Sequence, residues 1–418
     1  MSAIDKAATS FIHDLDALRE ILPPVMAMAI TIRKDSAKKH LDYLEEHGTF
    51  IREEEEEGGK NKIYHLDASQ TREISRIERQ HQRSRTATKL LPRTFLVSFV
   101  SVYDAFLGRL ITALLQEKPE VLNSSARQLT YKELKEFTDL ESARTHILEQ
   151  EVESVLRESH FEQFKWLERT FDVKLREGLS AWPVFIELTE RRNLFVHCHG
   201  KVSSQYLKCC ADHKALTTGI GLGDTLEADN KYLVTAYKCL YEIGTKLSQV
   251  LWRKTKPDQL IQADEALNKI CYELLAEEKY DLATRLLEFG VKTLPKHGSD
   301  VTRRIFVINL AQAYKFSGKA QECLDELSKM DWSACAEQFN LCVVVLKDDF
   351  ALASKIMRSI GDSGALSKQE YIDWPVFRKF RESDEFKEAF LEIFKETPQT
   401  VQTVSDTSQP ASEEGPES

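Results

Sequence analysis

The sequence predicts an all-α protein, with a small N-terminal helix and hairpin segment, a helical bundle, and C-terminal helical repeats. Its 418 residues are 42% hydrophobic and 30% charged, the composition of a globular chain. Only 16 Gly and 11 Pro occur, too few for a turn-rich β-sandwich or barrel. Because one hydrophobic core rarely covers so long a chain, we expect several parts. These are residues 1–84, 85–255 and 258–396, and a disordered tail at 397–418.

The charge balance excludes a protein that attracts anions over its whole surface. The net charge is −10, so binding of nucleic acid or an anionic membrane would have to be local. The stretch Ile21 to Ile30 is far shorter than the ~20 apolar residues of a membrane span, and the N-terminus lacks the pattern of a secretory signal. The eight cysteines show no paired CxxC spacing. We therefore expect a cytoplasmic protein with reduced thiols and no membrane association.

The first part is predicted to be a helix followed by a hairpin. Leucines at helical spacing before and after Pro23 predict a helix that ends near Gly48. Short apolar segments at 49–51 and 62–64 flank an acidic run at 53–57 and two glycines, a pattern typical of a hairpin. Such an arrangement also occurs in winged helices, so a DNA-binding regulator using residues 31–66 is a distant alternative. Five glutamates at the hairpin tip argue against it, because they would repel phosphate.

The second part is predicted to be a helical bundle. Residues 71–85 form a charged, solvent-facing helix, whereas 95–115 are apolar nearly all round, which is typical of a central helix. Thr130 and Glu133 have capping-box spacing, and a charged helical stretch follows from about 140 to 169. Pro183 suits the first turn of the next helix, and Gly200 lies where a C-terminal cap belongs. A glycine-containing loop around 219–223 then leads into an amphipathic helix from about 230 to 253.

The third part resembles tetratricopeptide-like helical hairpins. One copy has small and large residues at Cys271, Leu274, Ala283, Leu287, Gly290 and Pro295. About 40 residues later, the pattern returns at Ala311, Tyr314, Gly318, Cys323 and Leu327. A weaker copy spans 340–360, and an amphipathic helix from 374 to 394 closes the stack. Beyond Pro398 there is no Lys or Arg and almost nothing apolar, which predicts the disordered tail.

One segment, residues 190–200, combines the side chains that chemistry would need. On a helix, Glu190, Asn193 and His197 lie in one narrow stripe, and the long side chain of Arg192 flanks it. The run Arg192-Asn193-Leu194-Phe195-Val196-His197 resembles the Arg-x(4–6)-His signature of the HEPN superfamily, in the variant with a polar residue after the Arg. The resemblance covers roughly residues 85–255. It implies a bundle of four to five helices that often dimerises through the motif helix, and in many members a metal-independent endoribonuclease.

The residue types fit that chemistry. An imidazole can take the proton of a ribose 2′-hydroxyl, and a guanidinium can hold the charge that develops on the adjacent phosphate. This assigns His197 as base and Arg192 as phosphate clamp, with Asn193 orienting the imidazole or contacting the phosphate. Asp104 is the expected acidic partner of Arg192 or His197, and Glu190 and Arg191 are expected to support the site. Two protomers would supply one histidine as base and the other as acid, leaving 2′,3′-cyclic phosphate ends.

Several alternatives stay open. The polar residues of the motif also fit helix crossings in a non-catalytic bundle, with Arg192 paired to Glu187 or Glu190. The protein would then be a dimeric scaffold whose repeats bind a protein or peptide. His197-Cys198-His199 offers too few well-spaced ligands for a metal, and no cofactor motif is present. The resemblance alone suggests a role in prokaryotic stress or antiviral defence, with the repeats as a sensor or docking surface.

Overall fold

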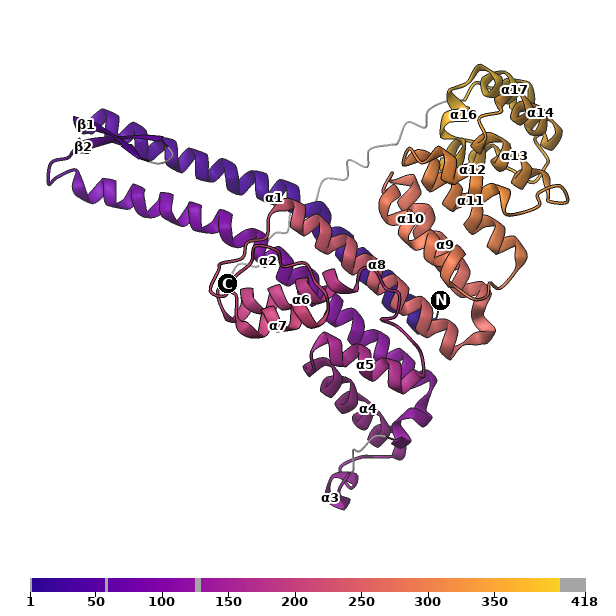
Figure 1. Ribbon diagram of the computed structural model, residues 1–418, viewed down its shortest axis with the longest axis horizontal. Helices are drawn as coiled ribbons and strands as arrows, with labels where there is room; N and C mark the ends of the chain where they lie inside the picture. The colour runs from indigo at the N-terminus through magenta and orange to yellow at the C-terminus, as the bar shows by residue number, and fades with distance from the viewer. Residues whose placement is uncertain (1, 57–58, 125–128, 399–418) are drawn as a thin grey trace, which may run out of the picture. The chain divides into compact units, whose positions relative to one another are not determined.

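The computed structural model describes residues 2–56, 59–124 and 129–398. Within these ranges the chain forms helices α1 to α17 and one two-stranded sheet, so the all-α prediction is confirmed (Figure 1). Two compact units are present. The first comprises the chain up to Leu267 together with Thr293–Ser299, and the second comprises Asn268–Lys292 and the chain from Asp300 onward.

A pair of long antiparallel helices dominates the first unit. Helices α1 (Ala3–His47) and α2 (Thr71–Glu117) are joined by strands β1 (Thr49–Glu56) and β2 (Gly59–His65), which pair antiparallel (Figure 1). The predicted helix end at Gly48 and the hairpin are therefore confirmed, while residues 57 and 58 at its tip lie outside the described ranges. Helix α2 runs unbroken through residues 84 and 85, where the sequence suggested a boundary. No glycine separates its charged half from its apolar half, and Pro92, which lies between them, does not end the helix.

The apolar half of α2 is buried, as expected for the centre of a bundle. Its aromatic rings meet Phe11 of α1, which stacks on Phe106 at 4.5 Å and contacts Tyr103 edge-on at 6.1 Å between ring centroids. Gly244 of α8 (Asn230–Thr255) lies against the Phe11 ring, where a side chain would clash. By length and composition alone α2 could cross a membrane, which differs from the sequence prediction of no such segment. Its apolar residues from Phe95 to Leu115, however, lie mostly buried within the first unit.

The remaining helices of the first unit are shorter. Thr130 and Glu133 form the predicted capping box, but α3 (Tyr131–Leu134) has only four residues. The charged stretch predicted as one helix is two, α4 (Leu140–Arg157) and α5 (His160–Phe171), because the Ser159 hydroxyl accepts a hydrogen bond from the Glu162 N–H and starts a new helix. Helices α6 (Trp182–His197), α7 (Ser204–Asp212) and α8 follow, with Pro183 in the first turn of α6 as predicted.

The second unit contains three successive helix pairs at the positions of the predicted repeats. These are α9 (Leu260–Ala276) with α10 (Tyr280–Glu288), α11 (Asp300–Phe316) with α12 (Ala320–Ser328), and α13 (Glu337–Leu346) with α14 (Phe350–Ile360). The division between the units falls inside α9. Each pair turns through one residue with positive φ: Glu278, Gly318 or Asp348. Their relation to tetratricopeptide repeats stays a prediction.

The end of the second unit differs from the single closing helix that the sequence predicts. After α15 (Lys368–Asp373), the segment divides into α16 (Arg378–Glu382) and α17 (Asp384–Phe394). The break occurs at Ser383, whose hydroxyl accepts a hydrogen bond from the Phe386 N–H at 3.2 Å and caps α17. The predicted disordered tail falls largely on residues 399–418, outside the described ranges.

Candidate active site

Helix α6 carries the motif and lies antiparallel to α2. Phe185, Ile186 and Leu188 of α6 are buried and anchor it in the bundle. Two polar contacts fix its register on α2: the Arg192 guanidinium meets Asp104, and Arg93 donates to the carbonyl of His199 just beyond the end of α6. The C-terminal end of α6 therefore lies near the middle of α2, at the level of Arg93.

The end of α6 is held in place by the residues that follow the motif. Gly200 has a φ of 83°, and its N–H donates to the Leu194 carbonyl at 2.9 Å. A side chain at Gly200 would approach the Leu226 carbonyl and the Phe195 ring at 3.1 and 3.2 Å, so glycine is needed here. Arg93 adds two hydrogen bonds of 3.1 Å, to the carbonyls of His199 and Leu226. These contacts fix the backbone that carries His197.

Asp104 lies at the centre of a polar cluster between three helices. One of its carboxylate oxygens accepts a hydrogen bond from Arg192 Nη2 of α6 at 2.9 Å, and the other lies 2.9 Å from His160 Nε2 of α5. Side-chain exposure is 34% for Asp104, 20% for Arg192 and 7% for His160. The expected pairing of Asp104 with Arg192 is thus present. Arg192 Nε is buried and makes no hydrogen bond within the described part of the chain.

Glu190 lies close enough to this cluster to interact with its charges. Burial raises the pKa of its carboxyl group, while the nearby charges of His160 and Arg192 act in the opposite direction. A carboxyl group of this kind takes up a proton more readily than an exposed one. Glu190 therefore adds a titratable group near Arg192 and His160, and its supporting role in catalysis stays a prediction.

Arg191 belongs to a different, structural network. It donates to Glu187 at 2.7 Å and to the Glu227 carbonyl at 2.8 Å, and its guanidinium lies over the Tyr232 ring. The buried Glu187 carboxylate also accepts hydrogen bonds of 2.6 Å from the hydroxyls of Tyr206 and Tyr232. Burial and the Glu187 charge raise the pKa of both tyrosines. This network ties α6 to α7 and α8, so Arg191 supports the fold of the site without facing the Asp104 cluster.

The structure does not bring Arg192 and His197 into contact. His197 is exposed at the last position of α6, and Asn193 is half-buried one turn earlier. At about 100° per residue, Asn193 and His197 lie about 40° apart around the helix, whereas Arg192 and His197 lie about 140° apart. Asn193 and His197 therefore share a face, and Arg192 is held to one side on Asp104.

Two contacts of the site were not predicted from the sequence. His160 follows a serine cap within a stretch read as one continuous helix, so its helical face could not be assigned. Arg93 stands at the junction of the charged and apolar halves of α2, and nothing in its local sequence indicates a partner 106 residues away. The capping serine at 159 is the one local signal that would have placed His160 at a helix start.

Metal and thiol chemistry find little support in the residues that the structure describes. No group of three or more His, Cys, Asp and Glu side chains that could hold a metal ion occurs among them. All eight cysteines are free thiols, and Cys209 and Cys210 lie in α7. Burial raises the pKa of Cys209 to about 11 and that of Cys210 to about 12, so neither thiol is activated as a nucleophile.

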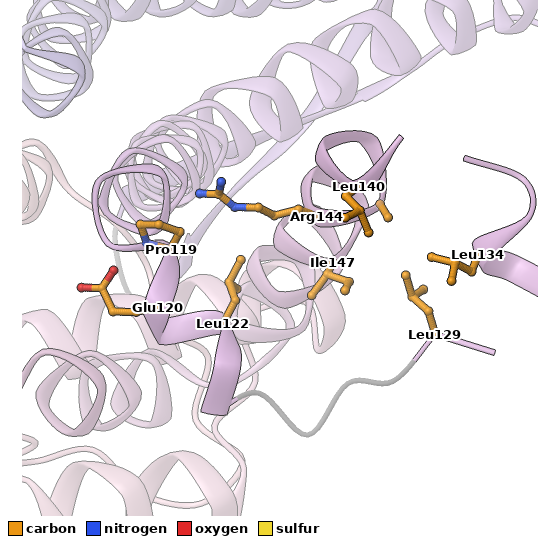
Figure 2. Close-up of a pocket in the computed structure, with 9 residues that line it drawn as sticks. Pro119, Glu120, Leu122, Leu129, Leu134, Leu140, Arg144 and Ile147 are labelled. Carbon is orange, nitrogen blue, oxygen red and sulfur yellow. The ribbon is translucent and has the colours of Figure 1, made fainter. Parts of the chain in front are cut away.

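A separate cavity of about 630 Å³ lies at another end of the first unit. Figure 2 shows its lining side chains, which come from the 3₁₀ helix η1 (Pro119–Ser124), α3, α4 and the chain just before α3. The lining residues are Pro119, Glu120, Leu122, Leu129, Leu134, Leu140, Ala143, Arg144 and Ile147. They are mainly apolar and include no histidine or cysteine, so this cavity offers less chemistry than the Asp104 cluster and the end of α6.

Comparison with family models, curated proteins and solved structures finds no match to the chain.

Proposed function

We propose that the protein is a metal-independent endoribonuclease whose active site is built around α6. The observation that carries this proposal is the exposed imidazole of His197, fixed at the end of α6 beside half-buried Asn193. Arg192 on the same helix keeps 20% of its side chain exposed while Asp104 orients its guanidinium. A base and a phosphate-binding cation are the two groups that RNA cleavage without metal requires.

The reaction follows from the chemistry of these groups. His197 accepts the proton of a ribose 2′-hydroxyl, and the resulting oxyanion attacks the adjacent phosphorus. The bond from phosphorus to the 5′-oxygen breaks, and the leaving oxygen takes a proton from a second acid. The products are a 2′,3′-cyclic phosphate and a 5′-hydroxyl. Arg192 stabilises the charge that develops on the phosphate oxygens, because its planar fork matches two of them.

The separation of Arg192 and His197 around α6 favours a site shared by two copies of the chain. One copy would supply the base, and the second copy the acid or the clamp for the same phosphate. Val196, beside His197, is 49% exposed and would be covered when two α6 ends meet. A homodimer through α6 is therefore part of the proposal.

The test compares matched histidine variants on RNA in the presence of EDTA. Wild-type protein is expected to cleave single-stranded RNA to cyclic phosphate ends, and His197→Ala is expected to lose this activity. His199→Asn is the control, because His199 is also exposed at the same helix end and asparagine tolerates its φ of 51°. Equal cleavage by wild type and His197→Ala would overturn the assignment.

A cellular measurement covers an enzyme that is held inactive after purification. Overexpression of the wild type is expected to stop growth and degrade RNA, whereas Arg192→Ala and His197→Ala are expected to be harmless at equal protein levels. Arg191→Lys keeps the positive charge in the Glu187 network and is expected to remain toxic if it folds. Toxicity of His197→Ala equal to that of wild type would count against a nuclease centred on this residue.

One observation favours a non-catalytic scaffold as the second candidate. A cavity of about 450 Å³ in the second unit is lined by aromatic residues and by the amides of Asn268, Asn309, Gln312 and Gln338. Gln312 Nε2 and Gln338 Oε1 are buried and make no hydrogen bond within the described residues. Amides offer both donors and acceptors to a peptide backbone. If Gln312→Ala abolished peptide binding in a protein that never cleaves RNA, this second function would be preferred.

A further inference from the structure

The distal half of α2 carries an uninterrupted row of exposed arginines in a chain that is acidic as a whole. Between residues 71 and 93 there are seven Lys and Arg against two Glu, a local net charge of +5, whereas the whole chain has −10. Four of these residues, Arg72, Arg76, Arg79 and Arg83, are exposed. They follow each other at intervals of four, three and four residues. We define these four as the arginine row.

The arginine row faces away from α1. At about 100° per residue, its four members fall within about 60° of one another around α2. The residues of α2 that face α1 include Ile74 and Ser84, which are buried, and His81, which lies 3.3 Å from Ser36 of α1. These positions lie about 120° to 200° around the helix from Arg72. The row therefore occupies the surface of α2 opposite its helical partner.

The same side of α2 carries α6. Arg93 and Asp104, which bind the end and the middle of α6, lie within about 60° of Arg72 around the helix axis. Figure 1 shows α6 beside α2, with the distal part of α2 continuing beyond it towards the hairpin. At 1.5 Å per residue, the row begins about 15 Å from Arg93 and ends about 32 Å from it. The row thus lies on the part of α2 beyond the end of α6 that holds His197.

We infer that the arginine row binds the phosphate backbone of RNA and guides the strand to His197. This inference rests on the proposed function. Consecutive members of the row lie about 4.5 to 6 Å apart along the helix, and exposed Lys89 adds charge between the row and α6. The row contains no aromatic side chain on which bases could stack, so recognition is electrostatic and independent of base sequence.

The binding experiment uses the full-length chain with His197→Ala and EDTA, so that RNA stays intact. Fluorescent single-stranded poly(U) is titrated at several salt concentrations against two quadruple variants. The test variant replaces Arg72, Arg76, Arg79 and Arg83 with Gln. The control variant replaces Arg33, Lys34, Lys38 and Lys39 of α1 with Gln, so it has the same charge change on exposed residues of the same helix pair. Circular dichroism melts establish that both variants fold.

The test variant is expected to bind RNA about tenfold more weakly than the parent protein. The slope of log K against log salt concentration is expected to become less steep by about 3, because each lost phosphate contact accounts for about 0.7. The control is expected to stay within about twofold of the parent. Equal losses in both variants would overturn the inference. Unchanged RNA binding by the test variant together with loss of binding to phosphatidylserine vesicles would also overturn it, because the row would then bind a membrane. Unchanged RNA binding together with loss of self-association would do the same, because the row would then contact a second copy of the chain.

Failure of this inference can be distinguished from failure of the nuclease proposal. If RNA binding depends on the arginine row but no RNA is cleaved in a His197-dependent manner, the row is an RNA-binding surface and the nuclease proposal is wrong. If cleavage depends on His197 while the test variant binds and cuts RNA as the control variant does, the nuclease proposal holds and the RNA-binding role of the arginine row is excluded.

Discussion

The two halves of the α1–α2 pair have the same secondary structure but are stabilised differently. Near the bundle, Phe11 and Phe106 are fully buried and stacked against each other. Towards the hairpin, the contact between the helices includes buried polar groups beside Ile74, with Ser36 Oγ 2.7 Å from Ser84 Oγ and 3.3 Å from His81 Nδ1. The comparison shows that a helix hairpin can continue well beyond its hydrophobic core, provided that its outer faces are charged and solvated.

Prolines lie where the half of the pair near the bundle meets the half near the hairpin, which we call the distal half. Phe11 opposes Phe106, and Ser36 opposes Ser84, so residues 23 and 24 of α1 lie opposite residues close to Pro92 of α2. Each proline inside a helix removes one backbone hydrogen bond. With Pro23, Pro24 and Pro92 near one level, the pair is weakened there in both helices. We therefore expect the distal half to open locally while the bundle stays folded.

The largest expected effect is the loss of a core ring from the half near the bundle. Phe11→Ala should lower the free energy of unfolding by about 3–5 kcal/mol, because it leaves a cavity beside Phe106 and Gly244. Ile74→Ala in the distal half should speed amide exchange mainly in residues 31–47 and 71–88. Chemical denaturation and hydrogen exchange measure the two effects. If both variants lowered global stability equally, the pair would be one cooperative unit and the comparison would fail.

A second prediction concerns the charged network that joins α6 to the bundle. Glu187→Gln should cost about 1.5–3 kcal/mol, because hydrogen bonds from two tyrosines and from Arg191 lose their charged acceptor. Tyr232→Phe removes only one of these bonds and should cost less. A thermal melt of Glu187→Gln identical to that of the wild type would show that the network adds nothing to stability.

The polar contact of the distal half should behave as a coupled pair. Ser36→Ala alone should cost about 1 kcal/mol in local opening, since it leaves buried Ser84 with a poorer set of hydrogen bonds. The double variant Ser36→Ala/Ser84→Ala should recover most of this loss, because neither hydroxyl remains. Hydrogen exchange of the four proteins gives the coupling energy. Simple additivity of the two single effects would contradict this account.

The distal half should also weaken at mildly acidic pH. Burial lowers the pKa of His81, and the nearby charges of His40, Arg85 and Arg33 lower it further. A group with a lowered pKa in the folded state takes up its proton more readily when the helices open. The stabilisation is therefore complete above the unfolded pKa of about 6.5 and declines as the pH falls towards the folded value. Exchange near Ser36 and Ser84 should increase from pH 7.5 to pH 5.5, and His81→Gln should remove this difference.

The smallest expected effect belongs to the outward face of the distal half. Arg76 pairs with Glu73 at 2.9 Å, but 75% of its side chain is exposed. Arg76→Gln should change stability by less than about 0.5 kcal/mol while weakening RNA binding measurably. A large drop in melting temperature would mean that the arginine row is structural.

Parts of the fold that depend on neighbouring residues were predictable. The helix end at Gly48, the hairpin, the capping box at Thr130 and the proline in the first turn of α6 all have local signals in the sequence. The division at Ser159 and the continuity of α2 were not predicted. Charged sequence is compatible both with one helix and with two, and a change of composition does not by itself end a helix.

The sequence by itself determined the helical class of this protein and the position of Arg192, Asn193 and His197 along one helix, because periodicity and capping act over a few residues. Only the tertiary structure decided that Asp104 binds both Arg192 and His160, which lie 88 and 56 residues away. It also decided that Arg192 is held away from His197, and that the arginine row lies on the part of α2 beyond the end of α6. The physical reason is that such contacts depend on how helices pack, and packing joins residues that no local pattern relates.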